Sequence, residues 1–271
     1  MNVPYSEDHQ PARTMDVFAP DRPNGAAVLL VHGGGWSGGE KAQWHSTALY
    51  LSSKGYVCAS AAYRLAPATK FPAQIEDVRL AMSFFRGLAK RKGFTATKVA
   101  AMGSSAGGHL VALLATIGPD DKLGWTEEVT AADTRPNAVI AYCPATDLHQ
   151  NRPGGFLPDA VLNFLGQSES EAPELYRQAS PVDRVTGAEC PFLFVHGDQD
   201  PTIPHTFSVG MGEKLRAAGA QAEVVTLPGV GHGFGYGVTQ DVQKTAIGHV
   251  ERFLGLMFKD EAQAGSGDKP T

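Results

Sequence analysis

Apolar residues in this chain gather in short runs that alternate with amphipathic stretches between about residue 27 and residue 258. Six of the runs are mostly apolar along their length, rather than apolar only at every second position. Such runs are typical of parallel strands that are buried on both faces of a sheet. The pattern therefore predicts six strands, at residues 27–32, 56–63, 98–103, 138–143, 192–196 and 222–227.

In the stretches between these runs, apolar residues recur at the three- and four-residue spacing of amphipathic helices. The clearest example places Ile75, Val78, Met82 and Phe85 on one helical face. Strands that alternate with helices predict an α/β fold, with a mostly parallel, doubly wound sheet, right-handed crossovers and helices on its faces. Ligands bind such sheets at the carboxyl ends of the strands. The predicted helices are residues 42–54, 73–90, 106–117, 207–218 and 242–258.

One long segment, residues 145–191, interrupts this alternation. Insertions of this length in compact domains are more often functional than not, so we expect a small cap of short helices at about residues 146–185. The alternative to a cap is a long surface loop without a function. Residues 259–271 are rich in Gly, Ser, Lys and Asp and are predicted to be disordered. The expected organisation is one domain over residues 1–258.

Charge and composition indicate which partners and which cellular location to expect. The net charge is −5 and the longest basic run is residues 90–92, so a nucleic-acid partner has no support. No apolar stretch approaches the roughly 20 residues that span a bilayer. Residues 1–20 lack the apolar core of a signal peptide, which predicts a cytoplasmic location without excluding secretion. Three widely spaced cysteines favour buried free thiols, as in a reducing compartment.

The candidate chemistry begins with the sequence Gly-Ser-Ser-Ala-Gly at residues 103–107, between a predicted strand and a predicted helix. This is the G-x-S-x-G nucleophile elbow, in which a tight turn projects a serine hydroxyl. Side chains at the flanking glycines would collide with the neighbouring strand and helix. Only Ser105 has glycine two positions before and two positions after it, so Ser105 is the predicted nucleophile.

Three further motifs follow predicted strands. They are His-Gly-Gly-Gly-Trp at residues 32–36, His-Gly-Asp-Gln-Asp at 196–200 and Gly-His-Gly-Phe at 231–234. The order of oxyanion glycines, serine, aspartate and histidine is that of an α/β-hydrolase triad. His232 is the predicted base, since a glycine-rich loop can bring it over the elbow. Asp200 is the predicted orienting acid, and Asp198 is its rival.

An oxyanion hole needs backbone N–H groups close to the developing negative charge. The glycine loop and the residue after the nucleophile supply these groups, which assigns Gly34, Gly35 and Ala106. The helix that begins at the elbow adds the positive end of its dipole. A glycine run alone could also be a flexible turn. A phosphate-binding loop is excluded, because no G-x-x-x-x-G-K-[ST] pattern occurs.

Across roughly residues 4–258, the chain resembles the α/β-hydrolase esterases typified by bifunctional feruloyl/acetylxylan esterases, which are related to the hormone-sensitive-lipase-like esterases. The resemblance implies a serine carboxylic-ester hydrolase with the triad Ser105, Asp200 and His232 and with no cofactor. The motifs that carry it are HGGGW at 32–36, YRLAP at 63–67, FPAQIEDV at 71–78, GSSAGGHL at 103–110, SP at 180–181 and HGDQD at 196–200.

The expected substrates are short-chain or aryl carboxylic esters, such as feruloyl or acetyl esters of plant cell-wall carbohydrate. An arylformamidase or amidase with the same triad and a general short-chain esterase are alternatives, and a catalytically silent ligand-binding fold is a further one. No metal is expected, and the predicted assembly is a monomer or a homodimer. Expected pocket residues, for which core packing is an equal alternative, are Trp36, Phe156, Leu157, Phe164 and Phe234.

Overall fold

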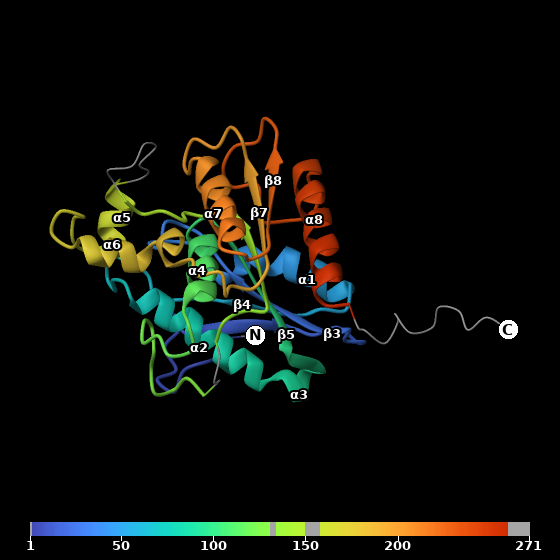
Figure 1. Cartoon of the computed structure of the whole chain (residues 1–271). Helices are drawn as coiled ribbons and strands as arrows, with labels where there is room; N and C mark the ends of the chain where they lie inside the picture. The colour runs from blue at the N-terminus through green and yellow to red at the C-terminus, as the bar shows by residue number, and fades with distance from the viewer. Residues whose placement is uncertain (1, 131–133, 150–157, 260–271) are drawn as a thin grey trace.

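A central sheet of eight strands organises the computed structural model, which describes residues 2–130, 134–149 and 158–259 (Figure 1). The strand order is β1-β2-β4-β3-β5-β6-β7-β8. All six predicted strands are present. The strands are β1 (Val3–Pro4), β2 (Thr14–Phe18), β3 (Gly25–Val31), β4 (Val57–Ala61), β5 (Phe94–Ser104), β6 (Ala138–Tyr142), β7 (Phe192–Gly197) and β8 (Ala222–Leu227).

The sheet is parallel from β4 through β3, β5, β6 and β7 to β8. The two remaining strands, β1 and β2, pair antiparallel at one edge, and β2 joins the sheet by pairing with β4. The sequence analysis missed both, because the N-terminal segment is polar and carries no continuous apolar run. The mostly parallel sheet confirms the predicted fold class.

Helices cover both faces of the sheet (Figure 1). Residues of α1 (His45–Ser53) and α8 (Asp241–Met257) pack in one apolar cluster, and those of α2 (Ala73–Gly87), α4 (Ala106–Thr116) and α7 (Thr206–Ala217) pack in the other. The predicted helix at 42–54 is in fact a 3-10 turn, η1 (Lys41–Trp44), followed by α1. The helix predicted at 73–90 ends at Gly87 and is followed by α3 (Ala89–Lys92).

Strand β3 shows why the central strands are apolar throughout. Leu29 and Val31 belong to the cluster on one face, whereas Val28 and Leu30 belong to the cluster on the other. Successive side chains of a strand point to opposite faces, so a strand covered by helices on both sides needs apolar residues at every position. All four side chains are fully buried.

The chain runs from β3 to β4 on one side and then crosses to β5 on the other side of β3, which makes the carboxyl end of β3 a switch point in the strand order. The segment proposed as a cap contains α5 (Pro158–Leu165), α6 (Pro173–Ala179) and the 3-10 turn η2 (Pro181–Arg184). Within the described parts of the chain, no helix combines the length and the apolar character needed to cross a membrane.

Candidate active site

Ser105 lies on the sharp turn between β5 and α4, with φ 54° and ψ −120°. Such backbone strain costs on the order of 1–3 kcal/mol and clusters at functional sites. A Cβ at Gly103 would lie 2.3 Å from the carbonyl oxygen of Gly107, and a Cβ at Gly107 would lie 2.1 Å from that of Val31. Both flanking positions therefore require glycine, for the steric reason inferred from the sequence.

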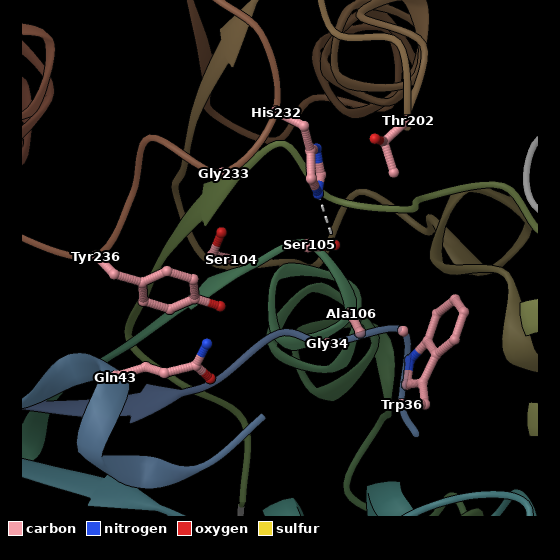
Figure 2. Close-up of a pocket in the computed structure, with 11 residues that line it drawn as sticks. Gly34, Trp36, Gln43, Ser104, Ser105, Ala106, Thr202, His232, Gly233 and Tyr236 are labelled. Carbon is pink, nitrogen blue, oxygen red and sulfur yellow. Dashed lines mark hydrogen bonds between the residues drawn. The ribbon is translucent and has the colours of Figure 1, made fainter. Parts of the chain in front are cut away.

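His232 lies above this turn, in the loop after β8 (Figure 2). Its Nε2 is 3.0 Å from the Oγ of Ser105, and its Nδ1 is 2.7 Å from the Oδ2 of Asp200. Because Nδ1 faces a carboxylate, it carries the proton, which leaves Nε2 free to accept one. The structure thus brings together the serine, the histidine and the aspartate selected from the sequence.

The Asp200 carboxylate is fully buried in the loop after β7. Its Oδ1 accepts the backbone N–H groups of Thr202 at 2.8 Å and Ile203 at 2.9 Å. Its Oδ2 accepts the proton on His232 and lies 3.2 Å from the Nε2 of His196. The rival of Asp200, Asp198, instead accepts the backbone N–H of Gly229. The geometry favours Asp200 as the partner of the base.

These contacts shift two pKa values in opposite directions. Burial raises the pKa of Asp200, but hydrogen bonds from His196, His232 and two backbone N–H groups together hold that pKa well below its ordinary value. Burial lowers the pKa of His232, but the hydrogen bond to Asp200 raises it, with a further contribution from Cys143, and the net direction is upward. The carboxylate therefore stays ionised and strengthens the imidazole as a base.

His196 is a second imidazole partner of the Asp200 carboxylate. Its Nε2 faces two acceptors, Asp200 and the carbonyl oxygen of Ile203 at 3.0 Å, so this nitrogen carries the proton. Its Nδ1 lies 2.8 Å from the hydroxyl of Ser208, which donates to it. These contacts hold the loop after β7 against the start of α7.

The residues proposed for the oxyanion hole lie at the carboxyl end of β3 and at the start of α4. Gly34 (φ 116°) and Gly35 (φ 58°) both have positive φ, a region that favours glycine. Among the residues that the structure describes, no acceptor takes the N–H of Gly34 or Gly35. Ala106 is the first residue of α4, where helical N–H groups have no partner within the helix. These three N–H groups are therefore available to an anion.

The site opens into a pocket of about 270 Å³ (Figure 2). Figure 2 shows Trp36 and Thr202 on one side of Ser105, and Gln43, Ser104 and Tyr236 on the other. The lining residues are Gly34, Gly35, Trp36, Gln43, Ser104, Ser105, Ala106, Thr202, His232, Gly233 and Tyr236.

Of the three expected pocket side chains that the structure describes, Trp36 alone lines the pocket. Phe164 is fully buried behind Trp36, with ring centroids 4.4 Å apart in a stacked arrangement. Phe234 packs on Tyr142, 5.3 Å away, in the core. The expectation that these two phenylalanines line the pocket is wrong, and the alternative of core packing holds. Phe156 and Leu157 lie outside the described residues.

Sequence reasoning missed Gln43, Ser104, Thr202 and Tyr236 as pocket residues. The sequence positions of two of them could have indicated the pocket, since Ser104 is next to the nucleophile and Tyr236 lies in the same loop as His232. Gln43 had none, because it comes from η1, well after the glycine loop. Only the folded chain brings η1 to the carboxyl edge of β5.

His109 braces the aromatic side of the pocket. The indole N–H of Trp36 donates to its Nδ1 at 3.1 Å, and its Nε2 donates to the carbonyl oxygen of Ala179, at the end of α6, at 2.7 Å. Burial lowers the pKa of His109 to about 4, so the ring is neutral and can accept the indole proton. His109 thus joins the nucleophile helix to Trp36 and to the segment proposed as a cap.

One group of potential metal ligands occurs among the described residues: Cys143, Asp200 and His232, whose donor atoms lie within 4.8 Å of one another. Two of these three side chains already hold each other in the hydrogen bond that orients His232 toward Ser105. A metal ion here would compete with that arrangement. The group therefore does not suit a resident cofactor for chemistry at Ser105.

Comparisons with known proteins place the chain among esterases. The family model BD-FAE matches residues 15–215. Esterase LipC of Mycobacterium tuberculosis is 35% identical over 243 residues, which is 86% of this chain and 59% of that protein. An acetylxylan esterase of Xylanibacter ruminicola is 26% identical, over 82% of this chain and 44% of that protein. The chain therefore spans about half the length of these curated relatives.

A solved structure supports the fold independently. A truncated carbohydrate esterase from gut microbiota superposes with a TM-score of 0.84 at 23% identity, covering 94% of each chain. At this level of sequence identity, the structural similarity supports the fold and not a shared activity. The fold is that of the α/β-hydrolases, with the mostly parallel sheet described above.

Proposed function

The chain belongs to the BD-FAE family, and from that premise we propose that it is a serine carboxylesterase that uses Ser105, His232 and Asp200 in an acyl-enzyme mechanism. The observation that carries the proposal is the continuous hydrogen-bonded line from the Ser105 hydroxyl through His232 to Asp200. The names of its relatives, an esterase and an acetylxylan esterase, support the same reaction class.

In the first step, the Oγ of Ser105 attacks the ester carbonyl carbon while the Nε2 of His232 takes the hydroxyl proton. The carbonyl π electrons move to the oxygen, and the N–H groups of Gly34, Gly35 and Ala106 stabilise the resulting anion. One such donor typically contributes about 3–4 kcal/mol to the transition state. Asp200 stabilises the imidazolium that forms.

The tetrahedral intermediate then collapses. The bond to the alcohol oxygen breaks, and His232 returns its proton to the departing alkoxide, which leaves an acyl group on Ser105. In the second step, His232 takes a proton from water, and the hydroxide equivalent attacks the acyl carbon. The bond to Ser105 breaks, His232 protonates the serine oxygen, and the carboxylic acid leaves.

The pocket favours short or aryl acyl groups over long chains. Its volume of about 270 Å³ is near the lower end of ligand pockets, which begin at roughly 300 Å³. Trp36, held by His109 and stacked on Phe164, supplies a rigid aromatic wall. We therefore propose acetyl or feruloyl esters of carbohydrate as substrates, and we expect little hydrolysis of long-chain esters.

The test is a substrate panel with purified wild-type protein and Ser105→Ala. The panel contains 4-nitrophenyl acetate, butyrate and decanoate, methyl ferulate, acetylated xylo-oligosaccharides and N-formylkynurenine. The proposal expects hydrolysis of the acetyl or feruloyl esters by the wild type alone. Preferred cleavage of N-formylkynurenine would reassign the chain to amide hydrolysis. Hydrolysis by folded Ser105→Ala at the wild-type rate would refute the mechanism.

A further inference from the structure

The polar side of the pocket carries a side-chain amide with a fixed orientation. The Oε1 of Gln43 accepts the backbone N–H of Glu40 at 3.1 Å, within a capping box at the start of η1. Its Nε2 therefore faces away from that N–H, and Figure 2 shows it turned toward Tyr236. No acceptor among the described residues takes the Nε2 hydrogens of Gln43. The amide thus presents unused donors to the pocket.

Tyr236 presents a second donor. Its phenol oxygen accepts the backbone N–H of Gly33 at 2.6 Å. The hydroxyl of Ser104 is a second partner of the phenol, and either hydroxyl of that pair can donate. When Ser104 donates, the phenol proton is available to a ligand in the pocket. The ring itself is fixed against Trp44, with centroids 4.9 Å apart.

The two side chains share one property: the oxygen of each accepts a backbone N–H within the protein, and each side chain can present a donor to the pocket. A pocket wall of this kind favours a ligand that brings acceptor oxygens, and disfavours plain hydrocarbon, because unpaired donors would lose water on binding. The opposite wall, at Trp36, offers an aromatic surface (Figure 2). The two halves of an ester therefore meet chemically different walls.

The alcohol half is the half that meets the donor wall. His232 must return its proton to the departing alkoxide, so the alcohol oxygen lies next to the Nε2 of His232. Tyr236 lies on the same loop as His232, and Ser104 precedes the nucleophile. Trp36 and Thr202 lie on the other side of Ser105 (Figure 2). The acyl group would therefore bind on the side of Trp36 and Thr202.

We propose that Gln43 and Tyr236 form a hydrogen-bond-donating subsite that selects esters whose alcohol half carries an acceptor oxygen close to the scissile bond. This inference rests on the proposed esterase function. It names the substrate feature that the pocket would recognise, which is an acceptor oxygen in the alcohol half. Sugars and other polyols have such oxygens on the carbon next to the esterified one. Simple alkyl alcohols have none.

The test uses two matched ester pairs that differ by one oxygen. On the alcohol side, 2-methoxyethyl acetate is compared with butyl acetate, in which a methylene replaces the ether oxygen. On the acyl side, ethyl methoxyacetate is compared with ethyl butyrate. The quantity measured is the ratio of kcat/KM within each pair, because a general loss of activity or of folded protein cancels in that ratio.

The main variants are Gln43→Met, which removes the amide donors, and Gln43→Glu, which keeps the acceptor for the N–H of Glu40. Gln243→Met is the matched control. The Oε1 of Gln243 accepts the N–H of Gln240 at 3.1 Å in the capping box of α8. Gln243 therefore caps a helix in the same way as Gln43, but it does not line the pocket. A lost hydrogen bond corresponds to about a 3- to 10-fold change.

We expect both Gln43 variants to lower the alcohol-side ratio by about 3- to 10-fold and to leave the acyl-side ratio unchanged. Gln243→Met should match the wild type in both ratios. An unchanged alcohol-side ratio in the Gln43 variants, with active enzyme, would overturn the subsite alone, as would a loss confined to the acyl-side pair. Absence of Ser105-dependent hydrolysis of every ester would overturn the proposed function, and the subsite with it.

Discussion

Two carboxylates, Asp200 and Asp77, are equally buried in this protein but are held by different kinds of partner. Both side chains are fully inaccessible to solvent. Asp200 is bound by two imidazoles and two backbone N–H groups. Asp77, on α2, is bound by two guanidinium groups, those of Arg13 at 2.8 Å and Arg64 at 2.8 Å.

The partners determine what each carboxylate can do. Arginine stays cationic under all ordinary conditions, so Asp77 is held in a permanent ion pair that ties α2 to Arg13, just before β2, and to Arg64, after β4. An imidazole can gain and lose a proton near neutral pH, so the charge next to Asp200 can change within one catalytic cycle. Burial alone therefore does not distinguish a structural carboxylate from one in an active site.

The largest expected effect is on catalysis at Asp200. Asp200→Asn should keep the shape of the site but present an amide to the Nδ1 of His232, which favours the wrong tautomer. We expect kcat/KM to fall by about 10⁴-fold, with near-native far-UV circular dichroism. Steady-state kinetics on 4-nitrophenyl acetate would check this. A loss of less than about tenfold would mean that Asp200 does not orient the base.

Asp77→Asn should show the opposite pattern. Removing one member of a buried ion network typically costs about 3–5 kcal/mol, because the remaining charges stay buried. We expect a large drop in the free energy of unfolding, measured with urea, and near wild-type kcat per folded molecule. Asp241→Asn, at an exposed pair with Lys244, is the control and should change neither quantity. A fully stable Asp77→Asn protein would contradict the comparison.

His196 provides an intermediate test, since it supports Asp200 without touching Ser105. His196→Phe removes one charge-assisted hydrogen bond to the carboxylate, which is worth about 1.5–3 kcal/mol. We expect kcat/KM to fall by about 10- to 100-fold, less than for Asp200→Asn, while KM changes little. An effect as large as that of Asp200→Asn would show that His196 is essential to the orientation of Asp200.

The smallest expected effect is on the pH profile. His232 must be neutral to accept the proton of Ser105, so kcat/KM falls as the pH drops through the pKa of His232. Because the net shift of that pKa is upward, the midpoint of the acid limb should lie above the ordinary histidine value of about 6.5. Asp200→Asn should move this midpoint downward. A wild-type midpoint below about 6.5 would contradict the upward shift.

The same comparison shows what the sequence could and could not predict. Asp200 could be selected because it follows a strand in a motif whose order along the chain is informative. Asp77 lies in a helix whose pattern predicts packing, but nothing local indicates that Arg13 and Arg64 converge on it. Gln43 escaped prediction for the same reason, since its place in the pocket depends on contacts between distant segments. The strands β1 and β2 were missed because β1 has only two residues and β2 is interrupted by Asp16, so neither forms a continuous apolar run.

The most direct test of the central claim is to find the residue that becomes acylated or phosphonylated. The protein is treated with a fluorophosphonate, and the intact mass and the modified peptide are determined by mass spectrometry for the wild type and for Ser105→Ala. The account predicts one adduct per wild-type chain, located on Ser105, and none on the variant. An adduct that persists in Ser105→Ala, or an unlabelled wild-type protein, would contradict it.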